Sequence, residues 1–320
     1  MYKNTRNKYN KKNNTKSASK NSNNSQSKVN KENINERVNI QWFPGHMTKA
    51  IRDMQGSIGM VDAVCEMLDA RIPYSSHNPD IDEITKGKPR IILLNRIDLA
   101  DPNITNLWTN YYREKGYMVL QINARNGKGL NNFSQSISDL LSDKIERYNA
   151  KGQIGHVIRL MVVGIPNVGK STFINKVAGR KVSQVGDRPG VTKGKQWIKI
   201  SGNIELMDTP GILWPKFESK TVSENLAFTN AIKSEILDKE ELASDFFVML
   251  KNNYPQIIID RYKFTPNEHM TGYEMLIEAA RKRGYLMSGG EVNTERMAST
   301  ILTEYHSGKL GKISLEKPNG

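Results

Sequence analysis

The fold is decided by two short stretches, Asn95-Arg96-Ile97-Asp98 and, after it, Gly164-Ile165-Pro166-Asn167-Val168-Gly169-Lys170-Ser171. The second stretch has the spacing GxxxxGKS, in which backbone N–H groups and a helix N-terminus wrap nucleotide phosphates. An apolar run at 159–163 precedes it, and a helix-like segment follows at 170–178. Because this is the strand, loop and helix order that a phosphate loop needs, a chance match without function is the weaker interpretation.

The order of the two stretches is the informative feature. In most guanine-nucleotide switches the phosphate loop comes first and base recognition last, whereas here Asn95 and Asp98 come first. The Asp98 carboxylate matches the N1–H and N2–H donors of guanine, and adenine offers no such pair, so we expect GTP to be preferred over ATP. Asn-x-x-Asp alone also suits a helix cap. Together with the phosphate loop it predicts a circularly permuted P-loop G domain.

Residues near the phosphate loop have the chemistry that Mg²⁺ and phosphate need. We expect Lys170 to act on the β and γ oxygens and the Ser171 hydroxyl to bind Mg²⁺. Asp208 ends a strand-like run at 204–207 and would hold the metal through water, while Gly211 would offer its N–H to the γ-phosphate.

A loop rich in glycine and proline at 187–194 contains Thr192, the predicted second hydroxyl on the metal. Such a loop orders around the γ-phosphate and relaxes after hydrolysis, although Pro189-Gly190 also suits a plain turn. Asn123 and Ala124 follow another strand-like run, where a backbone contact to the base is expected. The full set expected to contact the nucleotide or its metal is Asn95, Arg96, Asp98, Asn123, Ala124, Asn167, Val168, Gly169, Lys170, Ser171, Thr172, Thr192, Asp208 and Gly211.

After residue 40, apolar runs alternate with helix-like segments. The expected strands lie at 61–68, 90–94, 118–122 and 158–163, with an antiparallel pair at 195–200 and 204–207. The expected helices lie near 47–58, 129–148 and 170–178, and beyond 221 at 221–234, 239–252, 272–283 and 294–305. This alternation predicts an α/β fold, a mainly parallel sheet flanked by helices, followed by a small all-helical C-terminal domain.

The first 39 residues differ from the rest of the chain in composition. They contain ten Lys or Arg against two Glu, a net charge of +8 out of +14 for the 320 residues, and almost no apolar side chains. Such a segment cannot bury enough apolar surface to fold, so it predicts a disordered basic arm, either a solvated tail or an electrostatic arm for RNA. The predicted division is the arm at 1–39, the permuted G domain at 40–220 and an RNA-binding helical domain at 221–320.

Several classes of protein are disfavoured by the composition. No apolar run approaches the ~18 residues that span a bilayer, so no membrane partner is expected. Cys65 is the only cysteine, which excludes an internal disulfide and favours a reducing, cytoplasmic location. Five histidines without a Cys/His cluster give no zinc signature.

Further stretches belong to a recognisable pattern: Gln41-Trp42-Phe43-Pro44-Gly45-His46-Met47, Asp69-Ala70-Arg71-Ile72-Pro73, and Arg281-Lys282-Arg283-Gly284 with Ser288-Gly289-Gly290. With the permuted motifs, they make residues 40–317 resemble the circularly permuted YlqF/YawG GTPases. The resemblance implies a GTPase that acts late in assembly of the large ribosomal subunit, with the subunit precursor and its rRNA as partners. A monomer in solution is expected. Arg96 stands where the family commonly has lysine, and its bulkier fork bears on base affinity.

Catalysis needs a group other than the usual glutamine, because the residue after Gly211 is Ile212, whose aliphatic side chain cannot orient water. The resemblance points to His46 as a remote catalytic residue, in addition to Lys170. The alternative is a histidine that merely begins a helix. It also suggests that Asn167 holds K⁺, against an ordinary role in the loop. Two functions remain open: a GTP-hydrolysing assembly factor stimulated by the large subunit, and an RNA-binding placeholder whose nucleotide mainly sets affinity.

Overall fold

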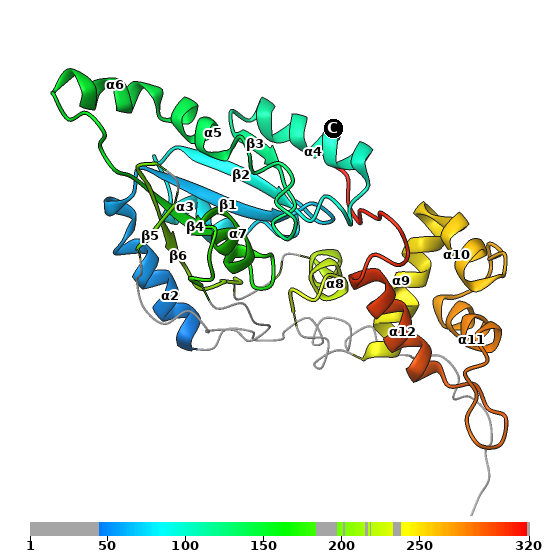
Figure 1. The fold of residues 1–320 in the computed structure, drawn as a ribbon. Coiled ribbons are helices and arrows are strands. Elements are labelled where there is room, and N and C mark those ends of the chain that lie inside the picture. The colour runs from blue at the N-terminus through cyan, green and yellow to red at the C-terminus, as the bar shows by residue number, and fades with distance from the viewer. Residues whose placement is uncertain are drawn as a thin grey trace, which may run out of the picture. The chain divides into compact units, whose positions relative to one another are not determined.

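A computed structural model describes residues 45–183, 197–200, 202–214, 217, 219–232 and 238–318 (Figure 1). The expected basic arm, the stretch 41–44, and the loop at 187–194 that contains Thr192 lie outside these residues. His46 falls inside a helix, but its side chain is not among those described. The described residues, all of which lie after residue 40, form one compact unit.

The described residues build a six-stranded sheet in the order β3-β2-β1-β4-β6-β5. Its strands are β1 (Ala63–Asp69), β2 (Arg90–Asn95), β3 (Met118–Gln121), β4 (Ile158–Val163), β5 (Trp197–Lys199) and β6 (Ile204–Asp208). All neighbouring pairs are parallel except β5 with β6. β1 and β2 are buried along their whole length, as strands of a covered parallel sheet are. The predicted α/β fold and its antiparallel edge pair are confirmed.

The sheet order explains how a permuted chain keeps an ordinary site. β4, which leads into the phosphate loop, lies between β1 and β6. β2, which leads into Asn95-Arg96-Ile97-Asp98, comes earlier in the sequence but lies on the far side of β1 from β4. Because the strands are parallel, their carboxyl ends meet at one edge of the sheet, and the order of the loops along the chain does not matter there.

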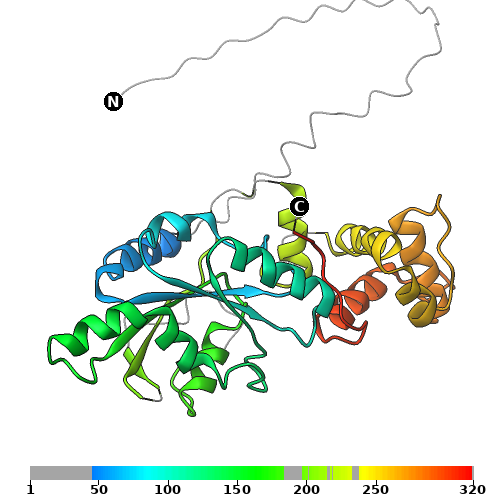
Figure 2. The same cartoon turned by 90° about the horizontal axis from the view of Figure 1, so that it is seen from above.

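Helices flank the sheet (Figures 1 and 2). They are α2 (Gly45–Gln55), α3 (Pro79–Ile84), α4 (Pro102–Glu114), α5 (Phe133–Leu140), α6 (Ser142–Ala150) and α7 (Lys170–Val177), with a 3₁₀ turn η1 (Ile58–Met60). The single helix expected at 129–148 is two helices that meet at Leu141. α3 and α4 were not anticipated, although both carry clear start signals: a proline in the first turn, and a side-chain cap from Asn78 or Asp101.

The remaining described residues are helical, in α8 (Lys220–Phe228), α9 (Lys239–Asn253), α10 (Pro255–Tyr262), α11 (Gly272–Lys282) and α12 (Thr294–His306). α9, α11 and α12 match the expected segments, whereas α8 ends at Phe228, short of the expected 234. α10 was not expected; it begins at Pro255, directly after α9. Its Ile258 and Tyr262 belong to a hydrophobic cluster that α8, α9, α11 and α12 share. The three-part division of the chain stays a prediction. Among the described helices, none is long and apolar enough to cross a membrane.

Candidate guanine-nucleotide site

The phosphate loop crosses the carboxyl end of β4 with almost no free space around its glycines. Gly164 has φ +147° and Gly169 has φ +108°, conformations that side chains rarely adopt. A Cβ at Gly164 would lie 2.6 Å from the Met67 carbonyl oxygen, and one at Gly169 would lie 2.5 Å from Asn95 Nδ2. The two glycines therefore let the loop pack against β1 and against the base-recognition motif.

Asn95 connects three loops that are far apart in the sequence. Its buried side-chain amide donates to the Val168 carbonyl at 2.8 Å and accepts from the Ala124 N–H at 2.9 Å. One side chain thus fixes the phosphate loop and the 123–125 loop to the end of β2. Asn95 is therefore a structural link between the loops of the site, and its expected contact with the nucleotide stays a prediction.

Lys170 is buried beneath the phosphate loop. Its Nζ donates to the Gly164 and Ile165 carbonyls at 2.9 and 2.8 Å. Burial lowers the pKa of Lys170 to about 8, with the nearby Asp208 carboxylate opposing the shift. A phosphate would supply the negative charge that this buried ammonium lacks, which suits the role expected of Lys170.

Asp208 has one oxygen satisfied and one not. Its Oδ2 accepts from the Ser183 hydroxyl at 2.5 Å, while its buried Oδ1 has no hydrogen-bond partner among the described residues. Burial raises the pKa of Asp208, which the Ser183 bond and Lys170 oppose. A buried carboxylate oxygen without a partner fits a Mg²⁺ site, with Ser171 half-buried at the start of α7. When bound, Mg²⁺ would neutralise charge on the phosphate oxygens.

Ser183 was not predicted from the sequence. It follows α7 and is held by Asn175, whose Oδ1 accepts from the Val182 and Ser183 N–H groups at 2.8 Å each and whose Nδ2 donates to the Ser183 carbonyl at 2.8 Å. No motif marks it in the sequence. Its contact is made with a carboxylate 25 positions away.

The residues after β6 press against the phosphate loop. A Cβ at Gly211 would lie 2.7 Å from Pro166 Cα and 3.0 Å from Lys170 Nζ, so only glycine fits there. Ile212 is buried, and its N–H lies 3.4 Å from the Gly164 carbonyl. The Ile212 carbonyl accepts from Asn78 Nδ2 at 3.2 Å. The position that often carries a glutamine is therefore a fixed core residue.

Asp98 is exposed at the end of the base-recognition motif, where its carboxylate is open to a ligand. Arg96, in contrast, contacts the phosphate loop. It adopts φ +66°, and its guanidinium donates to the Asn167 carbonyl at 2.6 Å and lies 3.6 Å from Asp69 Oδ2. The arginine in the place of the usual lysine thus braces the back of the phosphate loop through Asn167.

The side chains of Asn123 and Asn167 form hydrogen bonds that hold their own loops in place. Asn123 Oδ1 accepts from the backbone N–H groups of Arg125 and Asn126 at 2.9 and 3.2 Å, which shapes the loop expected to touch the base. Asn167 adopts φ +58°, and its Nδ2 donates to the Asn230 carbonyl at 2.9 Å. This bond leaves the Asn167 Oδ1 available as an oxygen ligand.

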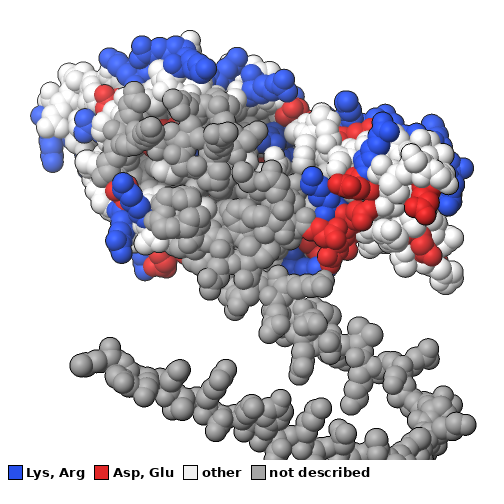
Figure 3. Space-filling view, turned by 90° about the horizontal axis from the view of Figure 1, so that it is seen from below, with Lys and Arg blue, Asp and Glu red and all other residues white. Residues whose placement is uncertain are grey.

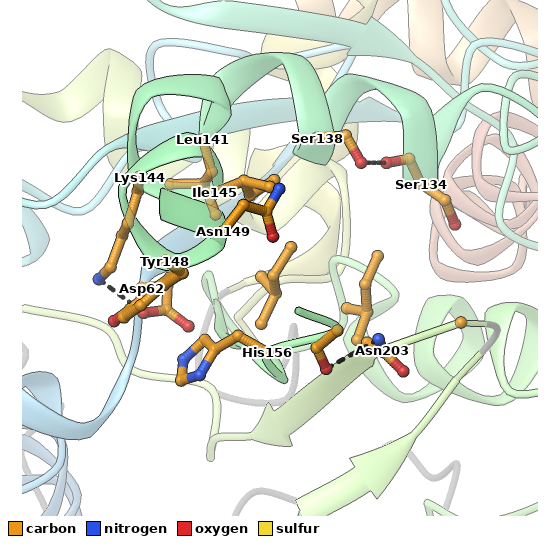
Figure 4. A pocket seen from close by; sticks show the side chains of 14 residues that line it. Asp62, Ser134, Ser138, Leu141, Lys144, Ile145, Tyr148, Asn149, His156 and Asn203 are labelled. Atoms are coloured by element: carbon orange, nitrogen blue, oxygen red, sulfur yellow. Dashed lines mark hydrogen bonds and ion pairs between the residues drawn. The ribbon is translucent and has the colours of Figure 1, made fainter. Parts of the chain in front are cut away.

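A cavity of about 270 Å³ lies elsewhere in the protein (Figure 4). It is lined by Asp62, just before β1, and by Ile158 and Ile204, which begin β4 and β6. Those are the amino ends of the strands, so this cavity lies at the edge of the sheet opposite the phosphate loop. The Lys144–Asp62 ion pair at 2.6 Å lies on its rim.

The described part of the site brings together the phosphate loop, Asp208, Gly211, Asn95 and the 123–125 loop on the edge of one sheet. This combination defines a circularly permuted P-loop GTPase. The sequence model of the 50S ribosome-binding GTPase family matches residues 159–274.

Whole-chain comparisons give the family. The chain is 46% identical to ribosome biogenesis GTPase A of Priestia megaterium over 88% of this chain and 98% of that protein. It is 30% identical to ribosome biogenesis GTPase A of Thermotoga maritima over 87% of this chain and 95% of that protein. The chain belongs to the ribosome biogenesis GTPase A family and is a GTP-hydrolysing enzyme.

Solved structures agree with this assignment. The GDP-bound structure of YlqF from T. maritima matches with a TM-score of 0.60 and 26% identity, over 83% of this chain and 98% of that one. The GNP-bound form matches with a TM-score of 0.57 and 27% identity, over 85% of this chain and 99% of that one. As a GTPase of this family the chain binds guanine nucleotide, which GTPases usually hold with Mg²⁺.

Proposed function

We propose that the protein is an assembly factor for the large (50S) ribosomal subunit, and that the subunit precursor stimulates its hydrolysis of GTP. The observation that carries this proposal is Ile212. Its side chain is buried in the core, and both its backbone groups are engaged. Because no polar group occupies this position, the free protein lacks the usual means of orienting the attacking water, and a partner that completes the site would raise the rate.

The proposal assigns the nucleotide and metal contacts to the residues that the sequence motifs predict. In this proposal Asp98 binds the guanine base, Lys170 the β and γ oxygens, and Gly211 the γ-phosphate through its N–H. Ser171, Thr192 and Asp208 hold Mg²⁺, with Asp208 acting through water. The buried Oδ1 of Asp208, which has no hydrogen-bond partner among the described residues, and the exposed carboxylate of Asp98 support these roles.

His46 is the proposed catalytic residue that positions water. It is the second residue of α2, and its assignment rests on the family resemblance. Asn167 is the proposed K⁺ ligand, supported by the Nδ2 bond to Asn230 that leaves its Oδ1 available. K⁺ beside the phosphates would supply positive charge where other GTPases use an arginine.

An rRNA partner is supported by surface charge. Segments 122–138 and 164–183 contain no Asp or Glu and five exposed cations: Arg125, Lys128, Lys176, Arg180 and Lys181. Figure 3 shows Lys and Arg side chains gathered along part of the border of one face. The net +8 of residues 1–39 adds a basic segment in the same chain. Positive charge of this density favours binding to a phosphate backbone. We also propose that the protein acts in the cytoplasm and as a monomer; its single cysteine, Cys65, suits a reducing compartment.

The alternative is an RNA-binding placeholder whose bound nucleotide mainly sets affinity, with hydrolysis incidental; the buried Ile212 is compatible with it. Co-sedimentation tests the shared part of both proposals. The protein should sediment with 50S but not 30S particles when bound to a non-hydrolysable GTP analogue, and less so with GDP. Equal sedimentation with 30S particles would contradict a large-subunit factor.

Deleting the basic arm, residues 1–39, tests its electrostatic contribution in the same experiment. Loss of a net +8 should weaken particle binding and lower its dependence on salt, since fewer counterions are released from the nucleic acid. GTP affinity should not change. An identical salt dependence with and without the arm would make the arm a solvated tail.

A further inference from the structure

The last described residues form an extended strap, residues 310–316, that returns from the end of α12 to the G domain and reaches α4 (Figure 1). Its Leu310, Ile313 and Ser314 are buried. These residues lie more than 200 positions after the base-recognition motif in sequence. No nucleotide motif lies in them.

The strap contacts the backbone that directly follows Asp98. The Ile313 N–H donates to the Leu99 carbonyl at 3.0 Å, and the Ser314 hydroxyl accepts from the Asp101 N–H at 3.1 Å. The Leu99 side chain also packs against Gly308, where an added Cβ would lie only 2.7 Å from it. The backbone on the carboxyl side of Asp98 is therefore held by the C-terminal segment.

The strap also holds the loop after β1, which supports the base-recognition motif from behind. The Leu315 N–H donates to the Arg71 carbonyl at 2.9 Å. Arg71 forms a buried ion pair with Asp69 at 2.7 Å, and Asp69 lies 3.6 Å from the Arg96 guanidinium. The strap thus contacts the backbone after Asp98 directly, and it is linked to Arg96, before Asp98, only through Arg71 and Asp69.

Two anchors fix the far end of the strap. The Glu316 carboxylate accepts from the Ser75 N–H at 2.9 Å, the Ser75 hydroxyl at 2.6 Å and Asn225 Nδ2 at 3.0 Å. The Tyr254 hydroxyl donates to the Ser314 carbonyl at 3.0 Å and lies 3.2 Å from the Ser314 N–H. Asn225 is in α8 and Tyr254 precedes α10, so the helical region holds the strap in place.

Asp98 itself is exposed, and the structure gives it no side-chain support among the described residues. Its position depends on the backbone on either side of it. We propose that residues 310–316 are a positioning element for guanine recognition, which holds the Asp98 carboxylate in register with the base and connects it to the helical region. This inference rests on the proposed role of Asp98 in binding guanine.

The test compares GDP with IDP, whose base lacks the 2-amino group that Asp98 would recognise. The Ser314→Ala/Glu316→Ala double variant removes side-chain contacts of the strap and leaves the nucleotide loops unaltered. It should bind GDP about tenfold more weakly, the equivalent of one or two lost hydrogen bonds, and GDP should dissociate faster. The preference for GDP over IDP should fall with it. Lys312→Ala/Lys317→Ala, at an exposed strap position and the exposed residue directly after the strap, is the matched control and should bind as the parent does.

If the double variant unfolds, Ser314→Ala alone serves as a milder variant. Its preference for GDP over IDP should also fall, but by less than in the double variant. A lower melting temperature with an unchanged preference for GDP over IDP would overturn the proposal and make the strap a structural brace only. Asp98→Asn is measured in parallel. Normal discrimination between GDP and IDP in Asp98→Asn would overturn the base assignment, whereas loss there but not in the strap variants would overturn the strap alone.

Discussion

The substitution Asp98→Asn should shift the base specificity of the site from guanine towards xanthine without affecting the fold. Asp98 is exposed and has no hydrogen bond or ion pair to another described residue, so the free energy of unfolding should change by less than ~0.5 kcal/mol. The substitution should instead weaken nucleotide binding. A carboxylate accepts both the N1–H and the N2–H of guanine, and a hydrogen bond to a charged group contributes roughly 1.5–3 kcal/mol.

Two such bonds amount to roughly 3–6 kcal/mol, and solvent access at Asp98 favours the lower end. We therefore expect GDP to bind Asp98→Asn about 10²-fold more weakly. Xanthosine diphosphate should gain affinity, because its 2-oxo group accepts from the new amide. Calorimetric titration of both nucleotides gives the two constants, with Asp139→Asn on α5 as an exposed charge-matched control. A GDP dissociation constant unchanged from the parent would refute the assignment of Asp98 to the base.

Three further outcomes follow from Lys170, Asn95 and Asn167. Because burial lowers the Lys170 pKa from 10.5 to about 8, the unfolded chain binds more protons between those values, and the contribution of Lys170 to stability rises with pH there. A bound phosphate would raise that pKa again, so binding of GDP should be accompanied by the uptake of about half a proton at pH 8 and almost none at pH 6.5. The uptake is measured from the GDP binding enthalpy in buffers of different ionisation enthalpy, with guanosine, which has no phosphate, as the control. Equal binding enthalpies in all buffers would contradict this prediction. Asn95→Ala leaves the buried Val168 carbonyl and Ala124 N–H unpaired and should cost ~2–5 kcal/mol in urea unfolding; a loss below ~1 kcal/mol would exclude Asn95 as the link between the loops. GTP turnover should be faster in KCl than in NaCl at equal ionic strength, and Asn167→Ala should remove the difference; equal rates for the parent would exclude K⁺.

The architecture of the G domain could be read from the sequence because its signals are local. Apolar runs gave the strands, and the position of Asn95-Arg96-Ile97-Asp98 before the phosphate loop gave the permutation. Of the helices that were missed, α3 and α10 are short and α10 directly follows α9, whereas α4 has 13 residues. Their start signals were present at Pro79, Pro102 and Pro255, but none was read.

The parts of the site that could not be predicted depend on contacts between distant residues. Nothing local marks Ser183 as the partner of Asp208. The Arg96 contact to Asn167 joins residues 71 positions apart, and it gives the unusual arginine a structural role that composition could not show. The roles of His46 and Thr192 come from the resemblance and from the motif, respectively, and they remain predictions.

In our proposal, the large subunit completes a site that Ile212 leaves without a water-orienting side chain. Single-turnover hydrolysis of GTP by the parent protein, alone and with saturating 50S or 30S particles, tests it most directly. We predict a rate that rises with 50S particles only and falls towards the unstimulated rate in His46→Ala at unchanged GTP affinity. A rate that is the same with and without 50S particles would contradict the account and favour the RNA-binding placeholder.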